Sequence, residues 1–250
     1  MPIVPLDFGS QSNPGRYGPD TGPRLINAYV EAADAKGKAV LPIYAIDGLS
    51  SFATLAGGSR CRGAISFGSY GYVVSGPLLY KVDTGGAVTV IGGIPNAAPV
   101  FMARNRKSPN AQIMIVTDGL RFIVENDVIT AIADPDLPAP NSVAGIAGYF
   151  LATIPDGRFF ISGLDEGTAW DALDFATAES SPDGLSVGYA RAGEVILAGP
   201  KSIEFWAHTG AAAFPFERVP GSTLQNLGIL CKHSMRDLND VVIFVASDGT

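Results

Sequence analysis

Side chains able to do acid–base chemistry are few in this sequence, and they form no recognisable catalytic pattern. His208 and His233 are the only imidazoles. Both stand in strand-like segments, EFWAHTG and LCKHS, where a structural histidine is commoner than a base or a metal ligand. No phosphate-binding loop, nucleophile elbow or zinc-protease motif occurs. The sequence therefore predicts no catalytic residue, no metal site and no cofactor, and we expect a protein that is not an enzyme.

Pairs of carboxylates are the remaining catalytic candidates, because glycoside hydrolases use two carboxylates that face each other across a sugar. The pairs are Asp134 with Asp136, Asp165 with Glu166, and Asp171 with Asp174. We expect every pair in a turn or at a strand end, where Asp usually accepts hydrogen bonds from backbone amides or faces water. A glycosidase built on a β-propeller is therefore the least favoured of the three function classes that we consider.

The cysteines and the clustered cations favour simple roles. Cys61 and Cys231 belong to no CxxC or Cys/His cluster, so neither a zinc site nor a disulfide framework is indicated, and we expect two reduced, buried thiols. Arg104, Arg106 and Lys107 form the only dense cationic run, which we interpret as a solvated turn. With a net charge of −7, the chain lacks the basic footprint of a sequence-independent nucleic-acid binder.

The aromatic residues allow a second function class. A carbohydrate-binding or receptor-binding protein could present them as a platform; they are Trp170, Trp206, Phe159, Phe160, Phe175 and Phe205. Each adjoins β-branched or leucine residues at strand spacing, so we expect them in the core between sheets.

Composition and patterning indicate an all-β fold. The sequence has 30 glycines and 18 prolines, which suit tight turns and disfavour helices. Residues 1–24 are so rich in Gly, Pro, Ser and Asn that no periodic apolar face can form, which predicts an extended N-terminal arm. Residues 25–250 alternate short apolar runs with turn clusters, which predicts one β domain. No signal peptide or membrane-length apolar run is evident, so we expect a soluble chain made in the cytoplasm.

A recurring unit predicts how the strands are grouped. In each unit an apolar strand enters a glycine turn and a second strand leaves it. We expect the glycine to supply the positive φ that a two-residue hairpin turn requires. The turn glycines are Gly76, Gly119, Gly157, Gly199 and Gly249, which lie 43, 38, 42 and 50 residues apart. A period near 40 residues, with about four strands each, is typical of a β-propeller built from stacked small antiparallel sheets. A β-sandwich with coincidentally spaced hairpins is the alternative.

The last unit stops at Thr250, directly after its turn. A sheet that ended there would expose an unpaired edge, which natural sheets avoid. We therefore expect this chain to be a fragment of a longer one, with a propeller that is incomplete at its C-terminus.

The stretch from Gly148 to Ser234 resembles a known family in the order and spacing of its motifs. These motifs are the segment from Asp171 to Phe175, AESSPDG at 178–184, IEFW at 203–206 followed by Thr209-Gly210, FER at 216–218, and Gly228-Ile229 before Cys231. LINAYVE at 25–31 and Gly48-Leu49 before Phe52 also match. They are similar to the packaged-DNA-stabilisation proteins of short-tailed bacteriophages, also called tail-hub or tail accessory factors.

This resemblance implies a structural virion protein without catalytic residues. Several copies, six by expectation, would form a ring below the portal–adaptor (head-to-tail connector) ring of the phage tail. The ring would extend the DNA channel, hold the packaged genome, and anchor a tail needle or plug and the tailspikes or fibres. DNA would pass nearby without specific binding, and we predict a negatively charged channel wall that repels phosphates. We also expect the arm of residues 1–24 to act in assembly.

Overall fold

The computed structural model describes residues 26–30, 43–56, 59–178, 181–239 and 241–248. The chain divides into two compact units, residues 1–51 and 52–250. In the described part of the first unit, β1 (Ala28–Val30) pairs antiparallel with β2 (Ile43–Ala45). The predicted arm lies outside the described residues, so its boundary at residue 24 stays a prediction.

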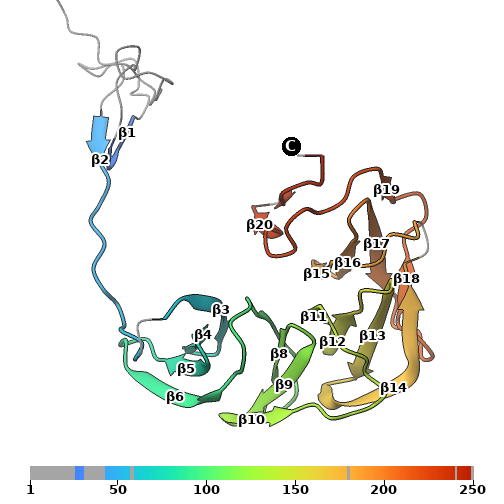
Figure 1. The fold of residues 1–250 in the computed structure, drawn as a ribbon, viewed down its shortest axis with the longest axis horizontal. Coiled ribbons are helices and arrows are strands. Elements are labelled where there is room, and N and C mark those ends of the chain that lie inside the picture. The colour runs from blue at the N-terminus through green and yellow to red at the C-terminus, as the bar shows by residue number, and fades with distance from the viewer. Residues whose placement is uncertain (1–25, 31–42, 57–58, 179–180, 240, 249–250) are drawn as a thin grey trace, which may run out of the picture. The chain divides into compact units, whose positions relative to one another are not determined.

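The second unit contains four small antiparallel sheets, each made from strands consecutive in the chain (Figure 1). Sheet 1 has β3 (Cys61–Phe67), β4 (Tyr70–Ser75), β5 (Leu78–Val82) and β6 (Val88–Gly93). Sheet 2 has β7 (Phe101–Arg104), β8 (Ile113–Thr117), β9 (Leu120–Glu125) and β10 (Val128–Ala131). Sheet 3 has β11 (Ser142–Ile146), β12 (Tyr149–Thr153), β13 (Arg158–Gly163) and β14 (Glu166–Thr177). Sheet 4 has β15 (Val187–Arg191), β16 (Glu194–Ala198), β17 (Ser202–His208) and β18 (Phe216–Arg218), with β19 (Leu224–Gln225) also on β17.

The repeating glycine unit is the middle hairpin of each sheet. The first four predicted units coincide with β4–β5, β8–β9, β12–β13 and β16–β17. Asp118 and Gly119 both have positive φ, of 48° and 79°, as the two-residue hairpin predicted there requires. Gly157 has a φ of 99° at the end of a longer loop, in which the amide of Ile154 pairs with the carbonyl of Arg158. Positive φ is thus confirmed at Gly119 and Gly157, and the two-residue turn is confirmed at Asp118-Gly119 but not at Gly157.

Gly199 corrects the general rule that we applied to the turns. It is absent from the described residues with positive φ, so its turn does not need glycine for that reason. Instead, a Cβ at Gly199 would lie 2.4 Å from the carbonyl oxygen of Gly184, closer than any real contact. Close approach of two backbones explains this glycine. The fifth unit was predicted to turn at Gly249, which lies outside the described residues.

The first strands of neighbouring sheets also approach one another closely, and they do so at small residues. β3 lies beside β7, β7 beside β11, and β11 beside β15. A Cβ on Gly63 of β3 would lie 2.6 Å from Val100, and one on Gly145 of β11 would lie 2.5 Å from the carbonyl oxygen of Arg104. Because the sheets converge at these strands, only small side chains fit there.

Sheets 2 and 3 each bury both faces against neighbouring sheets, so the core lies between sheets. Phe159 and Phe160 are adjacent on β13 and point to opposite faces, as the alternation along a strand requires. Phe160 belongs to the cluster between sheets 2 and 3, with Met114 and Phe150. Phe159 belongs to the cluster between sheets 3 and 4, with Trp206. A third cluster joins sheets 1 and 2. A single sheet would leave one of these faces in water, which is why the sheets stack.

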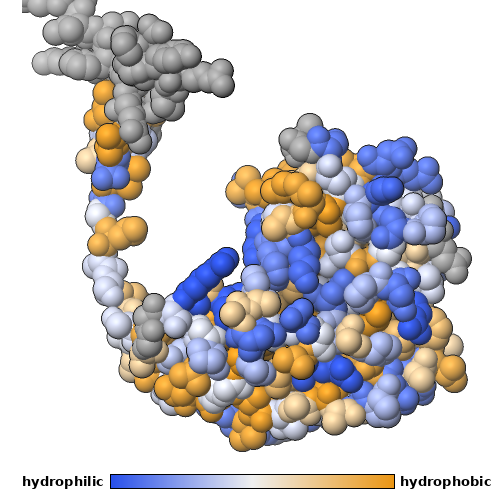
Figure 2. Space-filling view, in the orientation of Figure 1, coloured by the Kyte–Doolittle hydropathy of each residue, from blue (hydrophilic) through white to orange (hydrophobic). Residues whose placement is uncertain are grey.

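A further hairpin follows sheet 4. β20 (Arg236–Leu238) pairs antiparallel with β21 (Val241–Ile243), and Ile229 bridges to Ala246. Met235 and Ile229 are buried with Val187 and Ile203 of sheet 4, so this hairpin packs on that sheet. Figure 2 shows apolar side chains over β20, and those exposed in this segment include Leu238, Val241, Ile243 and Val245.

Candidate functional site: a basic pocket at the inner strands

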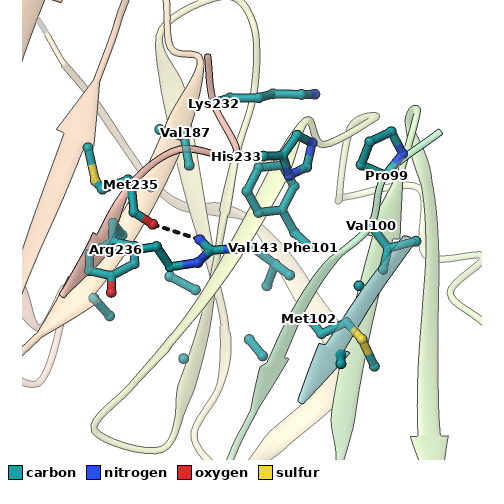
Figure 3. A pocket seen from close by; sticks show the side chains of 18 of the residues that line it. Pro99, Val100, Phe101, Met102, Val143, Val187, Lys232, His233, Met235 and Arg236 are labelled. Atoms are coloured by element: carbon teal, nitrogen blue, oxygen red, sulfur yellow. Dashed lines mark hydrogen bonds between the residues drawn. The ribbon is translucent and has the colours of Figure 1, made fainter. Parts of the chain in front are cut away.

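A pocket of about 550 Å³ lies where the first strands of the four sheets converge (Figure 3). Its walls come from β3, β7, β11 and β15, and residues 232–236 close one side. Apolar side chains form part of the lining: Val100, directly before β7, and Met102, Val143 and Val187 on the strands. The pocket therefore combines residues from five segments that are distant in the sequence.

Arg62 is the cation built most firmly into this region. It is only 6% exposed. Its guanidinium donates to the carbonyl oxygens of Gly76, Ile94, Pro95 and Ala98, to Asn96 Oδ1 and to Thr117 Oγ1, at 2.7–3.1 Å. Burial lowers its pKa, yet a guanidinium remains charged in proteins. With its donors engaged, Arg62 holds the loop before β7 to sheets 1 and 2 and contributes a fixed positive charge.

Three further cations line the pocket with more freedom. Lys232 Nζ donates to the carbonyl of Asn141 at 3.3 Å, and Arg236 donates to the carbonyl of Met235 at 2.6 Å. Arg60 is exposed and has no side-chain hydrogen bond or ion pair among the described residues. No carboxylate lines this pocket within the described part of the chain. A chain with a net charge of −7 thus has a strongly basic pocket.

His233 forms an apolar contact at the same place. Its ring stacks on that of Phe101 with centroids 4.2 Å apart, as Figure 3 shows. Burial, followed by the nearby charges of Lys232 and Arg236, lowers the pKa of His233 to about 4. The imidazole is therefore neutral at pH 7 and acts as a packing surface. His208 does not line this pocket, and its ring contacts those of Tyr149 and Phe216.

The cationic run predicted as a solvated turn has a structural role at Lys107. Its Nζ lies 3.1 Å from Glu125 of sheet 2 and 2.8 Å from Glu166 of sheet 3. Gln112, fully buried, donates to both carboxylates. Burial alone would raise the pKa of Glu166, but hydrogen bonds from Lys107, Thr168 and Gln112 outweigh it and lower the pKa to about 2. The solvated interpretation was wrong for Lys107, because the next sheet supplies its second partner.

The predicted carboxylate pairs are used structurally. Asp134 accepts from the amides of Asp136 and Trp170, and Asp165 accepts from the amide of Arg106. Asp171 and Asp174 were predicted in a turn or at a strand end; both lie inside β14.

The reason is a break in register. Phe160 pairs with Phe175, but Ser162 pairs with Trp170, so β14 bulges between these two pairs and carries Asp171 and Asp174 out of the ladder. Burial and the charge of Asp171 raise the pKa of Asp174. Among the described residues, no group of three or more His, Cys, Asp or Glu could hold a metal ion.

Both cysteines are free thiols, but the prediction that they are buried was wrong. Cys61 is the first residue of β3, and Cys231 opens a turn in which its carbonyl accepts from the amide of Ser234; both side chains are exposed. Their positions at an element boundary and in a turn leave no sheet to cover them. The aromatic prediction is confirmed: Trp170 and Trp206 are 6% and 8% exposed and lie in the clusters between sheets.

Comparison with known proteins decides the family. The family model of phage stabilisation proteins, described as bacteriophage P22 Gp10, beta-propeller, matches residues 23–250. The chain belongs to this family. The phage stabilisation protein is accordingly an all-β propeller protein and a structural component of the virion, of the kind that stabilises packaged DNA. This confirms the resemblance seen at residues 148–234 and the fold class predicted from the repeat.

Other comparisons add little. No curated protein matches the sequence. Among solved structures, a computationally designed protein, Ika8, is similar at 10% identity with a TM-score of 0.45, over 90% of this chain and 80% of that one. YCF48 from Cyanidioschyzon merolae is similar at 11% identity with a TM-score of 0.46, over 73% and 67%. No helix in the described residues has the length and hydropathy that crossing a membrane requires.

Proposed function

We propose that this phage stabilisation protein is a non-enzymatic tail hub. In the proposed assembly, six copies form a ring below the portal–adaptor ring, extend the DNA channel, and anchor the tail needle or plug and the tailspikes. The observation that carries the proposal is the family match over residues 23–250. Contacts with other virion components follow from membership of that family; the ring, its copy number and these particular partners are proposals.

The packing of the interior supports a role in which the protein resists mechanical force. Each pair of neighbouring sheets shares a buried apolar cluster, and polar side chains join the same pairs. Arg62 joins sheets 1 and 2, and Lys107 joins sheets 2 and 3. Close-packed interfaces of this kind resist deformation, which suits a protein that retains DNA under pressure. The negatively charged channel wall predicted above belongs to the ring of subunits and stays a prediction.

Mass photometry tests the hub directly. The 250-residue chain is measured alone and after mixing with the portal–adaptor complex of the same phage. We expect a monomer that joins the complex in a defined stoichiometry near six copies. A matched complex without the adaptor should bind no hub protein. A chain that stays monomeric beside the complete complex, and is instead retained on a glycan column, would contradict the hub and favour receptor binding.

A further inference from the structure

The charges of the inner-strand pocket point to a ligand. We propose that this pocket binds an extended acidic peptide, whose carboxylates pair with Arg60, Lys232 and Arg236 and whose apolar side chains contact Pro99 and Met102, two apolar lining residues that are not buried. All five residues line the same hollow of about 550 Å³, and no carboxylate of the described residues lines it with them. The proposal goes beyond the hub function, since it concerns a site within one subunit.

The available donors are the first argument. The guanidinium of Arg62 donates to six acceptors of its own chain. It therefore contributes positive charge to the pocket but no hydrogen-bond donor for a ligand. Arg60 has no side-chain partner among the described residues, and Lys232 makes one long hydrogen bond, of 3.3 Å. Arg236 donates one hydrogen bond, to the carbonyl of Met235. A guanidinium has five donors, so Arg60 and Arg236 retain donors for a carboxylate.

The walls of the pocket are the second argument, because they distinguish a peptide from DNA. A protein–DNA interface is broad and polar, and a single module buries roughly 600 Å² or more of protein surface. This pocket is concave, and its size falls in the range of sites that enclose a small ligand or a short chain segment, about 300–1,000 Å³. The side chains of Pro99 and Met102, which are not buried, lie among the cations, as Figure 3 shows. Alternating carboxylate and aliphatic groups match this mixture.

The test uses a fluorescein-labelled six-residue peptide that alternates glutamate and valine, titrated with the 250-residue chain and followed by fluorescence anisotropy. We expect saturable binding that weakens at least tenfold when glutamine replaces glutamate in the peptide. The double variant K232Q/R236Q should also weaken binding at least tenfold, and R60Q should weaken it less. The control K201Q/R218Q removes the same charge from exposed residues outside the pocket lining and should bind as the parent does.

Thermal unfolding of each variant shows whether it is folded, and R60Q, whose side chain is exposed, preserves the test if the double variant is not. Equal affinity of the parent, K232Q/R236Q and R60Q would overturn the proposal, and so would the absence of any binding by the acidic peptide. A 12-nucleotide single strand and inorganic phosphate serve as competitors. If either displaces the peptide at lower concentration than unlabelled peptide does, the pocket is a phosphate site and the proposal fails. Success of this test and success of the hub measurement are independent outcomes.

Discussion

Arg62 illustrates how one buried cation can hold two sheets together. Its guanidinium satisfies four carbonyl oxygens of the segment around sheet 1 and reaches Thr117 of sheet 2 at 3.1 Å. A buried carbonyl that loses its donor costs about 1–3 kcal/mol. This hydrogen-bond network stabilises the fold while every member is present. Removing the Arg62 guanidinium would leave several carbonyl oxygens without their donor.

We therefore expect R62M to lower the free energy of unfolding by about 3 kcal/mol, since methionine fills the space but donates no hydrogen bond. Urea unfolding followed by tryptophan fluorescence measures the change. R218M is the matched control, because Arg218 is exposed, and it should change stability by no more than about 0.5 kcal/mol. An R62M protein as stable as R218M would show that water replaces the lost donors.

His233 makes stability depend on pH in a definite direction. In the folded chain its pKa is lowered to about 4 by burial and by Lys232 and Arg236. In the unfolded chain the imidazole has its ordinary pKa of about 6.5. Between these values the unfolded chain binds a proton that the folded chain does not, so stability rises with pH from about 4 to about 6.5 and levels off above.

H233F should remove this contribution while keeping a ring on Phe101. The unfolding free energy of the parent should therefore rise relative to that of H233F as pH rises from 4 to 6.5, and the difference between the two should stay constant from pH 7 to 8. Unfolding midpoints at a series of pH values measure it, and H208F serves as the control. If the parent and H233F had the same pH dependence, or if the NMR signal of the His233 imidazole titrated near pH 6.5, the His233 ring would be more exposed than it is in the structure.

At the scale of elements, two glycines within strands differ in whether packing requires them. Gly145 on β11 and Gly71 on β4 both lie within strands, and neither has a positive φ. A Cβ on Gly145 would lie 2.5 Å from the carbonyl oxygen of Arg104, whereas a Cβ on Gly71 would have nothing within 4 Å. Only the first glycine is required by packing.

We expect G145A to destabilise the protein by about 2–3 kcal/mol, because two adjacent inner strands must move apart to admit the methyl group. G71A should be neutral or stabilising by about 0.5 kcal/mol, because alanine restricts the unfolded chain more than glycine does. Differential scanning calorimetry compares the two melting temperatures. If both variants melted with the parent, the inner strands would be further apart than their contacts indicate.

The sequence predicted the middle hairpin of each sheet because hairpins are local. Asp118 and Gly119 set their own turn, and the apolar strands around them are continuous runs. The inner strands escaped detection for a physical reason: small residues such as Gly145 and Gly188 give no apolar periodicity, and the sheet that needs them is about 40 residues away. A repeat of small residues at Gly63, Ala103, Gly145 and Gly188 was the available signal.

The basic pocket could not be predicted from spacing at all. Its cations come from both ends of the domain, Arg60 before β3 and Lys232 and Arg236 after sheet 4, and only the stacking of four sheets brings them together. Of the residues that line the pocket, only His233 was a candidate from the sequence, and its predicted role was structural. The composition gave a net charge of −7, which conceals a local surplus of positive charge.

At the scale of the whole molecule, assembly is expected to depend on residues that the described structure does not include. The sequence of residues 1–24 contains no periodic apolar face that could pack on the sheets. The family match begins at residue 23, and the second compact unit at residue 52. Folding of the sheets and recruitment into particles should therefore be separable by truncation.

Deleting residues 2–20 should leave the melting temperature of the sheets unchanged, because the sheets belong to a separate compact unit, residues 52–250. It should reduce incorporation into particles at least tenfold, since an arm that orders on a neighbouring subunit contributes binding only in the assembly. Complementation of a phage lacking the gene, with the variant counted in purified particles, measures incorporation, and replacing residues 2–20 by a shuffled sequence of the same composition is the control. A shuffled arm that restores incorporation would show that length alone matters, and a deletion variant that enters particles normally would exclude the arm from assembly and leave the sheets to carry every contact of the hub.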